Sequence, residues 1–227
     1  MVAQAVRGLG GIGKSTLALR HARARLAVGG GPVWWVTAES AHEVVAGLAR
    51  LAAVVSPVPA SLPLRDAADW AVTWLQGRTG WLVVLDNGED PAHIAPWLER
   101  LDTGQVLVTT RRDVAWPGTS TVPRVDTLRP DASLRVRRDL AGPHGTADDG
   151  TWRAVADELG HLPLALQQAG AYLAQTRPAP ARYLARLRCA SWDGPGTRCR
   201  LRNARCPSPS RRWAPTTPAP GTCAAGC

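Results

Sequence analysis

Phenylalanine is absent from this 227-residue chain, and lysine occurs once among its 27 basic residues, at position 14. The bias towards Arg, Ala, Gly and Pro is typical of GC-rich coding, so the arginine excess alone indicates little about binding partners. A lysine that survives this bias points to chemistry that arginine cannot supply. It lies in the glycine-rich run RGLGGIGKSTLALRHARARL, Arg7–Leu26.

Cysteine is missing from residues 1–188, and all five cysteines follow: Cys189, Cys199, Cys206, Cys223 and Cys227. This excludes a disulfide scaffold over most of the chain and fits a reducing compartment. There is no signal peptide and no apolar run of membrane-spanning length. We therefore expect a cytoplasmic protein that does not bind membranes.

The positive charge is concentrated near the carboxyl terminus. The formal net charge is +9, and residues 189–227 contain six arginines and a single acid, Asp193. Such a tail binds nucleic acid by charge alone, without sequence specificity and with strong salt dependence. No helix-turn-helix or stacking platform is evident, so we expect no specific nucleic-acid partner.

Apolar strands and amphipathic helices alternate through the first half of the chain, and the run at 81–87 is typical of a parallel strand buried on both faces. The pattern predicts strands over 1–6, 32–37, 81–87, 105–111 and 120–125, and helices over 15–26, 40–55, 66–77 and 91–101. Such alternation predicts an α/β fold with a parallel sheet flanked by helices.

The pattern changes at about Pro130. Residues 1–129 are expected to form the α/β domain, and residues 130–188 a small helical subdomain with helices over 151–160, 162–175 and 180–187. Residues 189–227 are rich in proline and lack an apolar face, so we expect disorder. Their cysteine spacing fits no zinc site well, which favours a frame-shifted read-through over a metal module.

The glycine-rich run satisfies G-x-x-x-x-G-K-[ST], the phosphate-binding loop (P-loop). Glycines let successive backbone N–H groups face one anion, and the helix that follows adds the positive end of its dipole. A compact lysine ammonium reaches the β- and γ-phosphates where the broad guanidinium of arginine does not. The predicted nucleotide-binding residues are Gly8, Gly10, Gly11, Ile12, Gly13, Lys14, Ser15 and Thr16.

Two residues at predicted strand ends complete a catalytic set. Asp86 closes the buried run at 81–87, where a carboxylate can hold Mg²⁺ together with the Ser15 hydroxyl. Arg111 ends the next strand, where a cation can sense a γ-phosphate. Asn87 lies where many P-loop ATPases place a second acid, and an amide is no general base, so hydrolysis is expected to be slow.

Five blocks in this order resemble the NB-ARC domain of the STAND class of P-loop ATPases, particularly bacterial members fused to tetratricopeptide repeats. The blocks are GLGGIGKSTLA, VWWVTAES, WLVVLDNGEDP, VLVTTRR and LGHLPLALQQAGAYL, and they span roughly residues 2–188. The resemblance implies a signalling switch driven by ADP and ATP. It also implies that Pro163 lies against the nucleotide and links its state to the angle between the subdomains.

Several features depart from the family pattern. The usual segment before the P-loop, the winged helix and the tetratricopeptide repeats are missing, and residues 131–150 match poorly, which suggests a truncated member whose self-association or partner binding would depend on flanking domains. Two alternatives to the switch stay open. One is a P-loop phosphotransferase acting on a small acceptor, with the arginines of 124–138 as a lid, and the other is a non-functional fragment.

Overall fold

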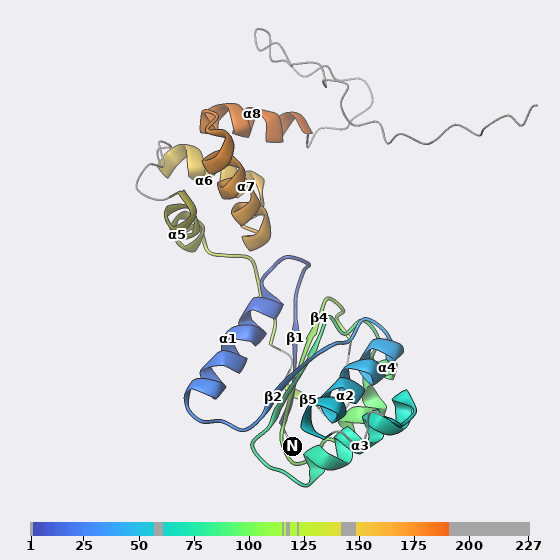
Figure 1. Cartoon of the computed structure of the whole chain (residues 1–227). Coiled ribbons are helices and arrows are strands. Elements are labelled where there is room, and N and C mark those ends of the chain that lie inside the picture. The colour runs from blue at the N-terminus through green and yellow to red at the C-terminus, as the bar shows by residue number, and fades with distance from the viewer. Residues whose placement is uncertain are drawn as a thin grey trace, which may run out of the picture.

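The computed structural model describes residues 2–56, 61–114, 116, 119–121, 123–141 and 149–190 (Figure 1). The expectations for the tail at 189–227 fall outside this part of the chain, apart from its first two residues, which end the last helix. Among the described helices, none has both the length and the apolar character needed to cross a bilayer.

The centre of the fold is a sheet of five strands in the order β2-β3-β4-β1-β5, with every pair of neighbours parallel. Its members are β1 (Val2–Arg7), β2 (Val33–Thr37), β3 (Leu82–Asp86), β4 (Gln105–Thr110) and β5 (Thr119–Thr121). The predicted α/β fold with a parallel sheet is therefore confirmed. After β5 the chain stays beside β1, because Arg7 N–H donates to the Pro123 carbonyl and Val125 N–H to the Arg7 carbonyl.

Helices cover the sheet and continue beyond it. The first four are α1 (Lys14–Ala27), α2 (Ala41–Val55), α3 (Leu64–Gln76) and α4 (Pro91–Leu98), and the last four are α5 (Pro130–Ala141), α6 (Asp149–Glu158), α7 (Pro163–Thr176) and α8 (Pro180–Ala190). Local signals fix two of the starts. Ser40 Oγ accepts a hydrogen bond from Glu43 N–H at the start of α2, and Asp90 Oδ1 accepts one from Ala92 N–H at the start of α4.

Alternation along each strand divides the sheet between two apolar clusters. In β3, Leu82 and Val84 pack with Ala18 of α1, whereas Val83 and Leu85 face the opposite side. That opposite side is covered by α2, α3 and α4 (Figure 1). Both faces are buried because helices lie on both, which explains why the β3 sequence is apolar without interruption.

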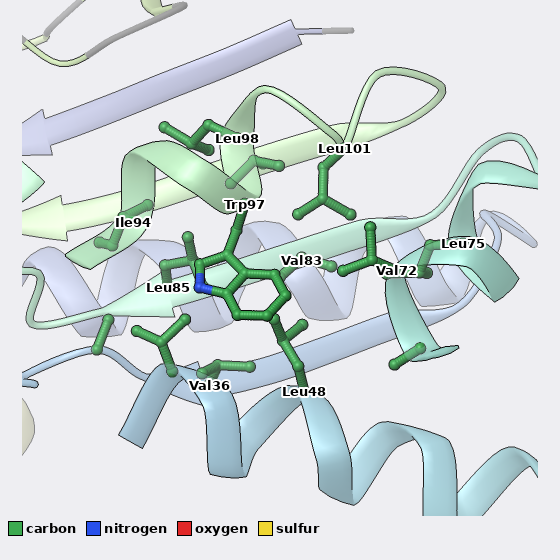
Figure 2. Packing of buried hydrophobic residues seen from close by; sticks show 14 of the residues in the cluster. Val36, Leu48, Val72, Leu75, Val83, Leu85, Ile94, Trp97, Leu98 and Leu101 are labelled. Atoms are coloured by element: carbon green, nitrogen blue, oxygen red, sulfur yellow. The ribbon is translucent and has the colours of Figure 1, made fainter. Parts of the chain in front are cut away.

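The larger cluster combines aliphatic side chains with the tryptophans Trp81, Trp97 and Trp116. Figure 2 shows Trp97 of α4 lying among Val83, Leu85 and Leu48. Trp81, just before β3, is fully buried, and its Nε1 donates to the Leu75 carbonyl over 2.8 Å. A Cβ added at Gly104 would lie 2.2 Å from the Trp81 ring, so the turn before β4 requires glycine.

A smaller cluster holds α5, α6, α7 and α8 together. Its large buried members Trp152, Val155 and Leu166 are each at most 1% exposed. Trp152 also donates from Nε1 to the Ser133 carbonyl of α5 over 3.3 Å. The helical stretch expected after Pro130 is thus present, and it includes a first helix, α5, beyond the three expected individually.

Candidate functional site

The P-loop connects β1 to α1 at the carboxyl edge of the sheet. Gly13 lies at φ 97° directly before α1, which has neither a capping side chain nor an acid in its first turn. The first N–H groups of α1 are therefore left for an anion. At the other end of the loop, Gly8 lies at φ 154°, and a Cβ there would be 2.6 Å from the Val125 carbonyl oxygen.

The ammonium group of Lys14 is hydrogen-bonded to the backbone of the P-loop. Nζ donates to the carbonyl oxygens of Gly8 and Leu9, each over 2.9 Å, and the residue is only 8% exposed. Burial lowers the pKa of Lys14 below its ordinary value, and the charge of Arg111 lowers it further. An ammonium has three donors, so one stays available for a phosphate oxygen.

Asp86 and Ser15 meet at the end of β3. Ser15 Oγ donates to Asp86 Oδ1 over 2.7 Å, and Thr109 Oγ1 of β4 donates to the same oxygen. A hydroxyl and a carboxylate are the hard oxygen donors that Mg²⁺ prefers, and Mg²⁺ sites commonly combine one or two carboxylates with substrate phosphates. The donors present therefore fit the predicted metal.

Asn87 lies next to Asp86 in a left-handed conformation, at φ 61°. Its backbone N–H donates to Thr109 Oγ1 over 2.9 Å, and its side-chain Nδ2 donates to Glu39 Oε1 over 2.5 Å. Thr109 thereby fixes both residues 86 and 87. Glu39 was not predicted as a site residue, because only its position just after a predicted strand distinguishes it in the sequence.

Arg111 lies beside the P-loop but is engaged by an acid. Nε and Nη2 both donate to Glu89 Oε1, over 3.0 and 2.7 Å, and Arg112 lies 3.6 Å from the other carboxylate oxygen. The hydrogen bond from Arg111 is the main cause that holds the pKa of Glu89 below its ordinary value. Arg111 lines a cavity of about 330 Å³ together with Gly8 and Ile12.

A second cleft, of about 240 Å³, lies between the P-loop and the start of α7. Its lining residues are Gly11, Gly13, Lys14, Ser15, Thr16, Pro163, Leu164 and Gln167. Pro163 is in the first turn of α7, where its missing N–H leaves no helical hydrogen bond unmade. Leu164 N–H donates to the Gly11 carbonyl over 3.2 Å, which joins the helical part directly to the loop.

His161 organises the turn that leads into α7. It adopts φ 54°, its carbonyl accepts from Leu128 N–H over 3.0 Å, and its Nδ1 lies 3.0 Å from Ser133 Oγ. Its Nε2 lies 3.1 Å from Asp157 Oδ1. The ring therefore links α5 to α6, and the backbone carbonyl of His161 links the turn before α7 to the segment that joins the two parts of the molecule.

The predicted site residues therefore divide between two places. Most of the P-loop set and Pro163 line one cleft, and Asp86 adjoins it through Ser15. Gly8, Ile12 and Arg111 line the cavity of about 330 Å³, and Gly10 lines neither: a Cβ added there would lie 3.7 Å from Cδ of Arg111. Leu164, Gln167 and Glu39 were not anticipated as site residues.

No protein-family model matches the chain. Among curated proteins, regulatory protein AfsR from Streptomyces coelicolor is 35% identical over 188 residues, covering 78% of this chain and 18% of that protein. AfsR from Streptomyces griseus is also 35% identical, with 78% and 19% covered. A nucleotide-binding leucine-rich repeat (NLR)-like protein from Hyaloscypha variabilis is 26% identical over 203 residues, with 79% and 20% covered.

The chain thus spans about a fifth of the length of these curated relatives. Among solved structures, a signal transduction ATPase with numerous domains (STAND) and a tetratricopeptide repeat sensor from Pyrococcus horikoshii aligns at a TM-score of 0.45 and 16% identity. The alignment covers 73% of this chain and 26% of that one.

Proposed function

We propose that this chain, which contains an NB-ARC domain of the STAND type, is a switch module that binds ADP or ATP with Mg²⁺ and hydrolyses ATP slowly at most. The observation that carries the proposal is the state of Lys14. Its ammonium is buried in the glycine loop and held by two loop carbonyls, beside the uncapped start of α1. These features support an anion site at the start of α1.

We propose that the phosphates lie between the P-loop and α7, in the cleft of about 240 Å³. The first N–H groups of α1 and the third donor of Lys14 bind phosphate oxygens there. Ser15 and Asp86 hold Mg²⁺, which neutralises charge on the phosphates when it is bound. The adenine base extends from this cleft along Thr16 and Gln167.

Pro163 and Leu164 are proposed to report the nucleotide state to the helical part of the chain. They belong to α7 yet line the same cleft as Lys14, and Leu164 is bonded to Gly11. A ligand that fills the cleft must contact both sides, so its affinity depends on how α7 is placed. By linkage, the placement of α7 then depends on the ligand.

We propose that Arg111 exchanges one anion for another. Glu89 accepts hydrogen bonds from the Arg111 guanidinium in this structure, and a γ-phosphate beside the loop would compete for the same donors. ADP lacks this group, so only ATP can release Arg111 from Glu89. The two nucleotides are thereby distinguished. The module is proposed to act in the cytoplasm, and its partners are proposed to bind through other segments of the intact protein.

Calorimetric titration with ADP and with ATP, both with Mg²⁺, tests the proposal. Lys14→Ala and Lys14→Arg should each weaken binding at least about tenfold, since a charge-assisted hydrogen bond contributes roughly 1.5–3 kcal/mol. The matched control is Arg23→Ala, which removes an exposed cation from the same helix. Unchanged affinity in Lys14→Ala, with its circular dichroism and melting temperature intact, would contradict the proposal.

A further inference from the structure

We propose that Glu39 is the general base of ATP hydrolysis, taking the proton from the attacking water. The inference rests on the proposed function, because it requires ATP in the P-loop cleft. Its distinguishing observation is the hydrogen bond from Asn87 Nδ2 to Glu39 Oε1. Through it, a carboxylate from the end of β2 is held beside the residue that follows Asp86.

The sheet places Glu39 at the correct edge. Thr37 pairs with Asp86 in the parallel register of β2 and β3, and Ala38 N–H donates to the Asp86 carbonyl over 2.7 Å. Glu39 follows Ala38, two residues beyond Thr37, so it leaves the sheet at the carboxyl edge next to the strand that carries Asp86. A carboxylate side chain extending from there can contact water next to a bound γ-phosphate.

The other carboxylates at this edge already have partners. Asp86 Oδ1 accepts from Ser15 and Thr109, and Asp90 Oδ1 caps α4. Glu89 is paired with Arg111 and Arg112 in this structure; because ATP is proposed to release Arg111, Glu89 is the competing base, which the Glu89→Gln variant below tests. Within the part of the chain that the structure describes, Glu39 Oε2 accepts no hydrogen bond, so this oxygen is available to a water molecule.

Asn87 gives Glu39 a defined position without taking its proton-accepting role. Its left-handed backbone is fixed by the hydrogen bond from its N–H to Thr109 Oγ1 over 2.9 Å. An amide cannot accept a proton from water at neutral pH, but it can orient a neighbouring carboxylate. Asn87 is therefore a positioning residue, and the second acid of the site comes from β2 instead of β3.

The chemical step balances with the groups named. The water oxygen bonds to the γ-phosphorus while its proton passes to Glu39 Oε2. The bond between the γ-phosphorus and the bridging oxygen breaks, and ADP leaves with that electron pair. The products are ADP and inorganic phosphate, and Glu39 then returns its proton to solvent.

Single-turnover hydrolysis of radiolabelled ATP, with Mg²⁺ and protein in excess, tests the role of Glu39. Glu39→Gln keeps an acceptor for Asn87 but removes the base, so the rate should fall at least about 100-fold, the usual size of a general-base contribution. Calorimetric affinity for ATP should stay within about twofold of wild type. Glu39→Asp, which keeps a shorter carboxylate, should recover part of the rate.

A pH profile separates this role from a merely structural one. Catalysis by a general base makes the rate depend on pH, and the part of that dependence that comes from Glu39 should be missing in Glu39→Gln. The control is Glu99→Gln, which removes an exposed carboxylate after α4 and should leave the rate unchanged. Equal rates in wild type and Glu39→Gln would overturn the inference, as would a larger loss in Glu89→Gln than in Glu39→Gln.

The two proposals fail in different ways. Wild-type protein that binds ATP but hydrolyses none within a day would overturn the role of Glu39 and leave the nucleotide switch standing. Wild-type protein that binds no adenine nucleotide would overturn the proposed function and, with it, the role of Glu39.

Discussion

The α/β part and the helical part of this chain differ in how much apolar surface they bury. Among the described residues, the larger cluster of the α/β part has 24 buried members, whereas the cluster that joins α5 to α8 has six. The P-loop joins β1, which packs in the larger cluster, to α1, which packs on the other face of the sheet, whereas Pro163 and Leu164 belong to α7 and the smaller cluster. The site therefore combines a well-buried wall with one that rests on few contacts.

This difference indicates which wall moves. Among the described residues, a single hydrogen bond joins the P-loop to α7, from Leu164 N–H to the Gly11 carbonyl. Regions with small cores and few long-range contacts open at lower free energy than large cores do. The helical part is thus suited to change its position with the nucleotide, while the P-loop keeps its form.

The largest expected effect comes from truncating one buried tryptophan in each core. Trp81→Ala and Trp152→Ala should each lower the free energy of unfolding of their own part by about 3–5 kcal/mol. Trp81→Ala empties the larger cluster and so destabilises the sheet that carries β1 and the P-loop, and nucleotide binding should therefore be lost. Trp152→Ala should loosen the helices yet leave weak binding. Urea unfolding followed by circular dichroism, with ADP titration of each variant, measures both effects.

The comparison would fail if the two variants behaved alike. Complete loss of ADP binding in Trp152→Ala, while the sheet stays folded, would show that the helical core is as necessary to the phosphate site as the sheet is. A single unfolding transition in wild type that both variants shift equally would show that the parts unfold together.

A smaller effect is expected at the contact between the parts. Leu164 is 46% exposed and lies within 3.1 Å of a Cβ added at Gly11, so Leu164→Ala removes apolar contact at the cleft without emptying a core. Nucleotide affinity should fall about three- to tenfold, as expected for loss of roughly 1 kcal/mol of apolar contact. Calorimetric titration measures this change.

Leu64→Ala is the matched control for this variant. Leu64 is 44% exposed at the start of α3 and lines no part of the cleft, so its truncation should leave affinity unchanged. An equal loss of affinity in the two variants would remove the argument for Leu164 as the point of contact.

Local patterns predicted the elements but not how their side chains pair. Three features are determined by residues that are adjacent in the sequence, and all three are present as expected: the apolar run of β3, the Ser40 cap and the P-loop motif. The helix α5 was not expected individually, because its arginine-rich sequence has few apolar positions to show a period. Its Leu134 nevertheless packs against the small core.

In the site, too, local sequence patterns predicted the backbone but not the pairing of side chains. The P-loop could be predicted because one contiguous motif determines its backbone. The partner of Arg111 could not, since Glu89 follows β3 whereas Arg111 follows β4. Glu39 was missed for the same reason: its hydrogen bond to Asn87 depends on the register of β2 against β3. Such contacts are set by the order of strands in the sheet, which no short sequence window contains.

Amide hydrogen exchange, with and without Mg²⁺ and ADP, tests the central claim most directly, because it reports on both walls of the cleft in one experiment. The account predicts that saturating ADP slows exchange both in residues 8–16 of the P-loop and in residues 161–167 at the start of α7. Slowing confined to residues 8–16 would contradict the link between nucleotide and helices. No slowing in either segment would contradict the nucleotide site itself.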